Sequence, residues 1–189
     1  MKHIFLLLSL AGLFFSCQPS PETTSVKTYY DLKGFLEKQV IGLNKQKPSV
    51  LKETKIGNSK DQKTTNAIDW NKELEIFLQT DLNKPAYKLS YVINRPDSTT
   101  YEYRLKDGEK MTVKYLKISV GLLSKQIEKL EAVVKQSNQL YHSEKQLLFT
   151  CAPAQNGQWQ IKTYEVSGFQ QLAMAEKKTF SVKGIVLGK

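Results

Sequence analysis

Two cysteines and one internal histidine are the residues of this chain best suited to nucleophilic or metal chemistry. Cys17 follows an apolar run near the start, whereas Cys151 continues an alternation of apolar residues with Leu147 and Phe149. That alternation predicts a buried thiol that acts as a small hydrophobic side chain. A catalytic cysteine needs a basic partner, and His142 is the only histidine beyond the first few residues. Catalysis by a Cys/His pair is therefore the less favoured interpretation.

The other motifs that carry chemistry are missing from the sequence. With a single internal histidine, a histidine-rich metal site is excluded, and the carboxylates show no metal-ligand spacing. There is no Gly-rich phosphate loop, no nucleophile elbow and no Ser/His/Asp set. We therefore expect no metal, no cofactor and no enzymatic activity.

The charge balance favours contact with lipid headgroups over nucleic acid. The chain carries 28 basic and 18 acidic side chains, a formal net charge of +10. Only Arg95 and Arg104 could supply the bidentate contacts that recognise phosphates and guanines. The lysines instead alternate along apparent strands, as on a solvated sheet face. We predict no nucleic-acid binding and a diffuse attraction to anionic lipids.

The first 17 residues are organised as an export signal. After Lys2, a dozen apolar residues would form a helix of about 18 Å, too short for a bilayer core of about 30 Å. The run ends in Ser16 and Cys17 and resembles a bacterial lipoprotein signal peptide, as in Bacteroidota-type outer-membrane lipoproteins. The resemblance implies a signal peptide over 1–16 and lipidation of Cys17. Since Phe14 stands where such signals most often carry leucine, a cleaved but unlipidated signal is the alternative.

Residues 17–27 are predicted to be a flexible tether, because they contain two prolines and no apolar periodicity. Gln18 is not the aspartate that holds some lipoproteins in the inner membrane, and Glu22 is the only acidic residue of the tether. The resemblance therefore implies a lipid anchor in the outer membrane, facing the periplasm.

Two helices are predicted in the first half of the domain that follows. Thr28 and Asp31 have the spacing of a capping box for a first helix, which Pro48 would end. Asp69 is a candidate N-cap for a second helix, with Trp70 at the head of its apolar face.

From Ala86 onward the apolar period changes from 3.6 to 2, which predicts antiparallel strands. A short strand is also expected over 50–56, followed by a polar loop over 57–65. The later strands are expected over 87–93, 101–105, 111–120, 125–136, 139–151, 159–166 and 180–186.

Two of these strands need further comment, on their secondary structure and on their regularity. Residues 123–136 fit either a helix or a strand, and we favour a strand because it would form a long hairpin with 139–151 about Ser137 and Asn138. A change of phase between Tyr115 and Leu116 predicts either a bulge or a stretch buried on both faces in 111–120.

The last hairpin shapes the functional hypothesis. If it turns about Glu176, Gly168 lies opposite Gly184, and such a pair suggests a bend or a close approach by another group. A bend would open a concave face where aromatic side chains could bind an acyl chain or similar apolar ligand. A helix packed over the glycines is the equal alternative.

The sequence thus predicts a single α+β domain over 28–189, with a helical part over 28–84 and a sheet over 85–189. The expected architecture is two helices on a curved antiparallel sheet of about seven strands. In outline this resembles the half-barrels of outer-membrane lipoprotein carriers and receptors. We expect a membrane-anchored binding module for an apolar ligand or lipid, and alternatively a module that contacts another envelope protein.

Overall fold

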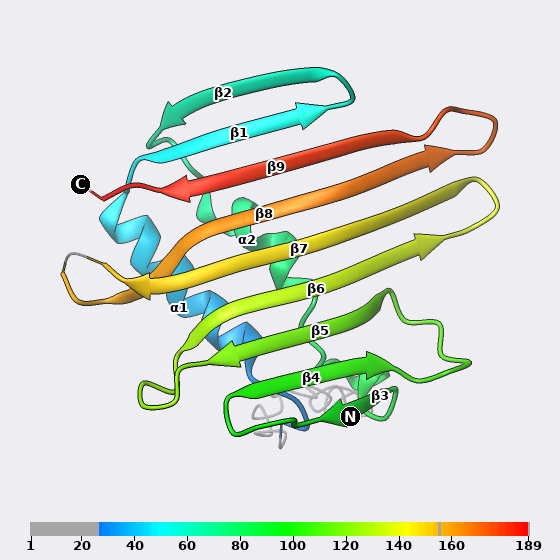
Figure 1. Cartoon of the computed structure of the whole chain (residues 1–189), viewed down its shortest axis with the longest axis horizontal. Helices are drawn as coiled ribbons and strands as arrows, with labels where there is room; N and C mark the ends of the chain where they lie inside the picture. Colours follow the sequence, from blue (N-terminus) through cyan, green and yellow to red (C-terminus); the bar gives the residue numbers. More distant parts are fainter. Residues whose placement is uncertain (1–26, 155, 189) are drawn as a thin grey trace, which may run out of the picture.

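The computed structural model describes residues 27–154 and 156–188, which form one antiparallel sheet with two α-helices on one face (Figure 1). The predicted α+β class is confirmed, and the sheet is open, with nine strands in place of about seven. Cys17, the predicted signal peptide and the tether up to residue 26 lie outside the described residues. The elements are α1 (Leu32–Gln46), β1 (Val50–Ile56), β2 (Ser59–Thr65), α2 (Trp70–Leu78), a 3-10 helix η1 (Pro85–Tyr87), β3 (Tyr91–Asn94), β4 (Thr100–Leu105), β5 (Val113–Val120), β6 (Ile127–Ser137), β7 (Tyr141–Pro153), β8 (Trp159–Leu172) and β9 (Lys178–Val186).

The strands are arranged in the order β2-β1-β9-β8-β7-β6-β5-β4-β3. Strands β3 to β9 follow one another as hairpins, and the early β1–β2 hairpin adds to the far side of β9, where Val50 pairs with Val186. The short strand predicted over 50–56 is confirmed as β1, and β2 is a second strand within the segment 28–84 that is predicted to be mainly helical. Figure 1 shows both helices behind the sheet, toward one end of its long strands.

Helix α1 begins one turn later than Thr28 predicts. Asp31 is its N-cap, and the Asp31 carboxylate accepts a hydrogen bond from the Gly34 amide at 3.0 Å. The helix buries Leu32, Leu36 and Leu43 against the sheet. It ends at Gln46, because Lys47 adopts a left-handed conformation (φ 46°) and Pro48 cannot continue it.

Helix α2 confirms the cap predicted at Asp69, whose side chain accepts hydrogen bonds from the amides of Asn71 and Lys72. Trp70 and Phe77 are fully buried on its inner face. Phe77 meets the Phe149 ring of β7 edge to face at 5.4 Å, so the apolar stripe of this helix belongs to the core.

The segment predicted as a loop over 57–65 is the edge strand β2. Its sequence, SKDQKTT, has no apolar alternation because neither face of this strand is buried. An edge strand can be wholly polar, and lysines there discourage pairing with other chains. The strand favoured within 123–136 is confirmed as β6. The pairing of β5 with β6 shifts register between Val113 and Tyr115, just before the place predicted for a bulge, and again between Ser119 and Val120.

The last hairpin corrects the predicted register. Gly168 pairs with Phe180 and Gly184 pairs with Tyr164, so the two glycines are not opposite each other. The turn lies nearer Met174, which takes a left-handed conformation (φ 63°), than Glu176.

Candidate functional site

The two residues considered for nucleophilic chemistry are kept apart by the fold. Cys151 lies near the end of β7, forms no disulfide among the described residues and is 7% exposed, as predicted for a buried thiol. Burial raises its pKa far above the usual thiol value, which disfavours the nucleophilic thiolate. His142 lies at the opposite end of the same strand, where its Nδ1 is 2.7 Å from Ser137 Oγ. A Cys/His pair is therefore not formed.

The helix-covered face of the sheet near Gly184 is filled by protein. A Cβ atom on Gly184 would enter the ring of Tyr164. The Tyr164 hydroxyl donates to Glu73 of α2 at 2.7 Å, and Lys52 of β1 donates to the same carboxylate at 2.8 Å. Burial, and then this hydrogen bond, raise the Tyr164 pKa. The sequence left two alternatives for this place, an apolar pocket or packed protein. The structure has packed protein here.

The described residues offer neither a metal site nor a membrane-spanning helix. They contain no group of three or more His, Cys, Asp or Glu side chains placed to hold a metal ion. Among the same residues, no helix has the length and apolar character needed to cross a bilayer.

The sheet face away from the helices carries a row of opposed charges. Across neighbouring strands, Glu102 lies opposite Lys117 and Lys117 opposite Glu131. Beyond Leu148 the pattern resumes with Glu165 opposite Lys183. Cross-strand pairs of opposite charge stabilise a solvated face and help to fix strand register.

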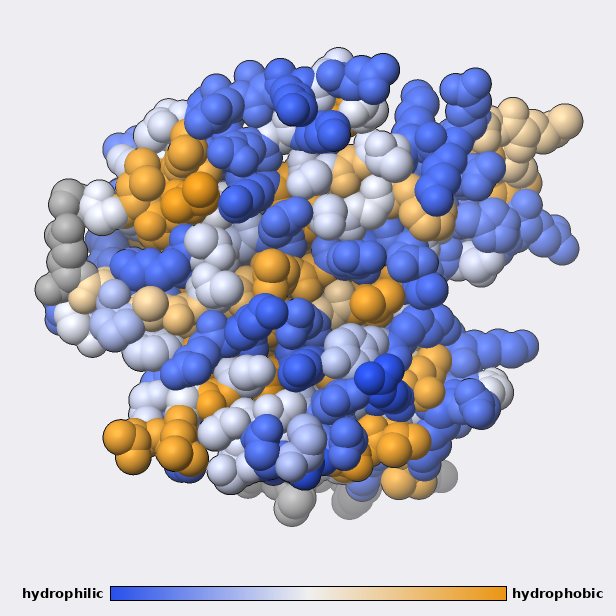
Figure 2. Space-filling model, viewed as in Figure 1, coloured by the Kyte–Doolittle hydropathy of each residue, from blue (hydrophilic) through white to orange (hydrophobic). Residues whose placement is uncertain are grey.

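A shallow hollow of about 290 Å³ interrupts this row over β5 to β8. Tyr115, Val133 and Leu148 are its apolar lining, and Glu131 and Glu165 flank it. Figure 2 shows this face with apolar patches between hydrophilic side chains. The sequence did not single out this hollow, because its residues come from four strands.

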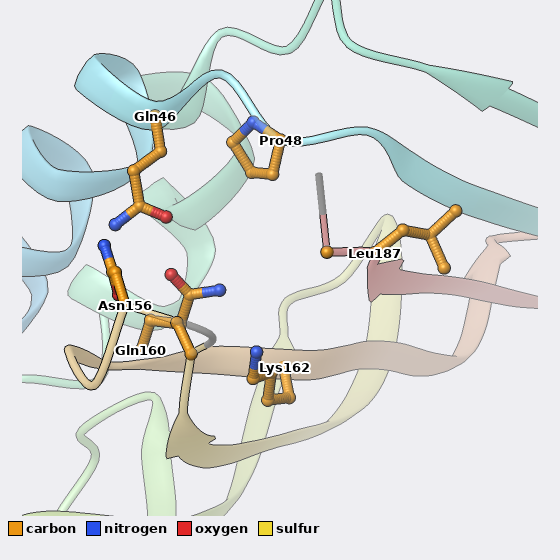
Figure 3. Close-up of a pocket in the computed structure, with 8 residues that line it drawn as sticks. Gln46, Pro48, Asn156, Gln160, Lys162 and Leu187 are labelled. Carbon is orange, nitrogen blue, oxygen red and sulfur yellow. The ribbon is translucent and has the colours of Figure 1, made fainter.

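A second cavity, of about 260 Å³, lies at the C-terminal end of α1 beside the end of β9. Figure 3 shows the amide ends of Gln46, Asn156 and Gln160 gathered there, with Pro48 and Lys162 on other sides. The rest of the lining is Ala154, Leu187 and Gly188. We call this cavity the amide pocket.

The amide pocket exists because β8 extends past the end of its ladder with β9. That ladder begins at Thr163, so the first residues of β8 have no strand on this side. The side chain of Gln39 in α1 forms hydrogen bonds with these residues where a strand is missing. Its amide group donates to the Trp159 carbonyl at 3.1 Å, and its oxygen accepts from the Ile161 amide at 2.9 Å. Gln160 lies between Trp159 and Ile161 in the sequence, so these two hydrogen bonds fix the backbone on both sides of it.

Gln160 is the unusual residue of this pocket. Gln160 is only 5% exposed, and its Oε1 atom has no hydrogen-bond partner in the described part of the chain. An unsatisfied buried polar group costs about 1–3 kcal/mol. Such a cost is removed when a ligand or an ordered water donates a hydrogen bond to the oxygen.

The pocket rim is held by other carboxamides. Gln158 Oε1 accepts from Gln46 Nε2 at 2.9 Å and from Asn156 Nδ2 at 3.0 Å, which joins the end of α1 to the β7–β8 turn. Lys162 reaches the cavity and forms no ion pair within residues 27–154 and 156–188. Sequence reasoning singled out Asn156 only as part of a turn, since these side chains share no spacing pattern.

Comparisons with known proteins do not assign the chain to a family. No family model, no curated protein and no solved structure matches it. The function must therefore be argued from the geometry itself.

Proposed function

We propose that this chain is a lipid-anchored, non-enzymatic binding module of the bacterial cell envelope. The anchor is Cys17, in the outer membrane facing the periplasm, as the resemblance of the first 17 residues to a lipoprotein signal implies. The domain holds a ligand in the amide pocket, and the unpartnered oxygen of buried Gln160 is the observation that carries this function. The open sheet, with α1 and α2 on one face, is the scaffold that carries this pocket (Figure 1).

The chemistry of the pocket supports a polar ligand more than an acyl chain. Three carboxamides and a lysine make up half of its lining residues, with Pro48 and Leu187 as apolar walls. An acyl chain placed there would leave the polar groups of Gln160 and Lys162 without partners, at a cost in affinity. A polar ligand is therefore the form in which we propose the binding function.

Ligand-observed NMR with a panel of polar and fatty-acid fragments tests the binding function on the full-length protein. Wild type is expected to bind polar fragments that Gln160→Leu no longer binds. If every fragment binds the two proteins equally, the amide pocket is not a binding site. Tight fatty-acid binding that survives Gln160→Leu would return the proposal to an apolar ligand at another place.

The anchor is tested separately by replacing Cys17 with serine. The wild-type chain is expected in the membrane fraction with the intact mass of a chain that begins at an acylated Cys17. Cys17→Ser is expected to leave a precursor or a chain released from the membrane. Mature wild-type protein with an unmodified cysteine would contradict the lipid anchor.

The hollow around Tyr115, Val133 and Leu148 favours a second candidate, contact with another envelope protein. Apolar side chains on an uncovered sheet face, rimmed by charges, are suited to a transient protein contact. A photo-crosslinking residue at Tyr115 is expected to yield one discrete adduct in cells, whereas the same residue at exposed Lys178 is not. Equal adducts at both positions would argue against this contact.

A further inference from the structure

The amide pocket is specific enough to indicate a class of ligand, and this inference rests on the binding function proposed above. Its volume, about 260 Å³, lies just below the range of about 300–1,000 Å³ typical of small-molecule sites. It therefore suits a molecule the size of a single sugar or a small organic acid rather than a chain of several units.

The carboxamide end of the pocket calls for a ligand with several hydrogen-bond donors. Gln160 Oε1 lacks a donor within the described residues, so this end of the pocket presents an unsatisfied acceptor. Gln46 is the last residue of α1, and the final carbonyls of a helix accept hydrogen bonds from outside it. The C-terminal end of a helix carries a partial negative charge. Neutral hydroxyl groups can donate to its carbonyls without placing a charged anion beside it.

The other side of the pocket calls for a negative charge. Lys162 lines the cavity, and in the described part of the chain no carboxylate neutralises it. An ammonium group attracts a carboxylate through a charge-assisted hydrogen bond. Figure 3 shows Lys162 apart from the amide of Gln46, so the charged and hydroxylated ends of a ligand are assigned to different sides.

We infer that the amide pocket binds a small hydroxylated carboxylate of the sugar-acid class. Its hydroxyl groups donate to Gln160 and to the end of α1, and its carboxylate lies against Lys162. Pro48, which is buried, and Leu187 provide an apolar wall for the carbon skeleton.

Sodium galacturonate is the probe, tested on the full-length protein by isothermal titration and by saturation-transfer NMR. We expect a dissociation constant of about 1 mM or tighter. Galactose, which lacks the carboxylate, and propionate, which lacks the hydroxyls, are each expected to bind at least about tenfold more weakly. If either binds as well as galacturonate, the inferred class is wrong.

Two variants and one control locate the binding. Gln160→Leu is expected to abolish galacturonate binding, and Lys162→Gln, at a partly exposed position, is expected to weaken it about tenfold while keeping the fold. Lys178→Gln removes one positive charge from the exposed start of β9 and is expected to change nothing. Equal weakening by Lys162→Gln and Lys178→Gln would show a non-specific charge effect and overturn the assignment.

The outcome separates this inference from the proposed function. If galacturonate fails to bind but other polar fragments bind and depend on Gln160, only the ligand class is wrong. If no fragment depends on Gln160, the binding function of the pocket fails as well.

Discussion

Tyr164 shows how a single residue decides what the helix-covered face of this sheet can do. Its ring covers Gly184, and its hydroxyl group binds Glu73, which also binds Lys52. One side chain therefore joins β8 to α2 and, through the shared carboxylate, to β1. Glycine is needed at 184 because this ring lies where a Cβ atom would be.

Three glycine substitutions test this packing. Two are expected to destabilise the protein, and the third, a control described below, is expected to stabilise it. Gly184→Val is expected to cost about 1–3 kcal/mol of unfolding free energy, because the added atoms push against Tyr164. Gly168→Val is expected to cost more, since its Cβ would meet the backbone carbonyl of Glu144, which cannot rotate away. Urea unfolding measures both changes.

The matched control is Gly42→Ala in α1, where an added Cβ meets nothing within 4 Å. Alanine is expected to stabilise the helix by about 0.5–1 kcal/mol. A neutral Gly184→Val variant would show that the ring of Tyr164 moves freely, contrary to the packing described.

The thiol of Cys151 is expected to react slowly as long as the protein is folded. Because the thiol is buried and its pKa is raised by burial, a maleimide is expected to label it slowly in the folded protein and fast in denaturant. Mass spectrometry after timed labelling measures the two rates. Comparable rates in the two conditions would mean that the end of β7 opens readily.

At the residue scale, the sequence predicts sites whose signal is local. The burial of Cys151 follows from its alternation with two neighbours, and the Asp69 cap from the helix that follows it. Gln160 carries no such signal, because its importance comes from Gln46 and Lys162 converging on it in three dimensions. No spacing in the chain records that convergence.

Among the elements, α1 is held to the sheet by more than its apolar face. Gln39 is buried and bonds both the Trp159 carbonyl and the Ile161 amide where β8 has no partner strand. Gln39→Leu leaves both backbone groups unsatisfied and is expected to cost about 2–5 kcal/mol of unfolding free energy.

Its control is Lys38→Leu, one residue earlier on the same helix and exposed, expected to stay within about 0.5 kcal/mol of wild type. Denaturant titration of both variants provides the comparison. A cost for Gln39→Leu no larger than that of Lys38→Leu would mean that water replaces Gln39 without loss.

The sequence prediction misses two features of the sheet, for different physical reasons. Strand β2 is polar on both faces, so no periodicity distinguishes it from a loop, and only its pairing with β1 makes it a strand. The sequence prediction puts the turn of the last hairpin at Glu176. In the structure the turn lies nearer the left-handed Met174, which changes the register between β8 and β9. Long alternating strands such as β6 and β7 were predictable because one face of each is buried.

For the molecule as a whole, buried tyrosines set an alkaline limit to stability. Burial raises the pKa values of Tyr29, Tyr91, Tyr103 and Tyr164 above the usual tyrosine value. A raised folded pKa gives stability that is complete below the unfolded pKa, about 10, and is lost as the pH rises toward the folded pKa.

The unfolding free energy is therefore expected to be level up to about pH 9 and to fall above about pH 10. The slope is up to about 1.4 kcal/mol per pH unit for each tyrosine that stays neutral in the folded state. Urea unfolding across this range, with tyrosinate absorbance recorded in parallel, measures it. Complete tyrosinate formation near pH 10 in a still-folded protein would contradict the prediction.

The pairing of β1 with β9 also has a consequence for the order in which the chain can fold. Strands β3 to β8 can assemble hairpin by hairpin as they are made, because each pairs with its neighbour in sequence. The β1–β2 hairpin is made before all of them, yet it joins the sheet only when β9 is present. Such a long-range closure is slow, since a long loop must be ordered first. This late step postpones completion of the sheet until the last strand has been made.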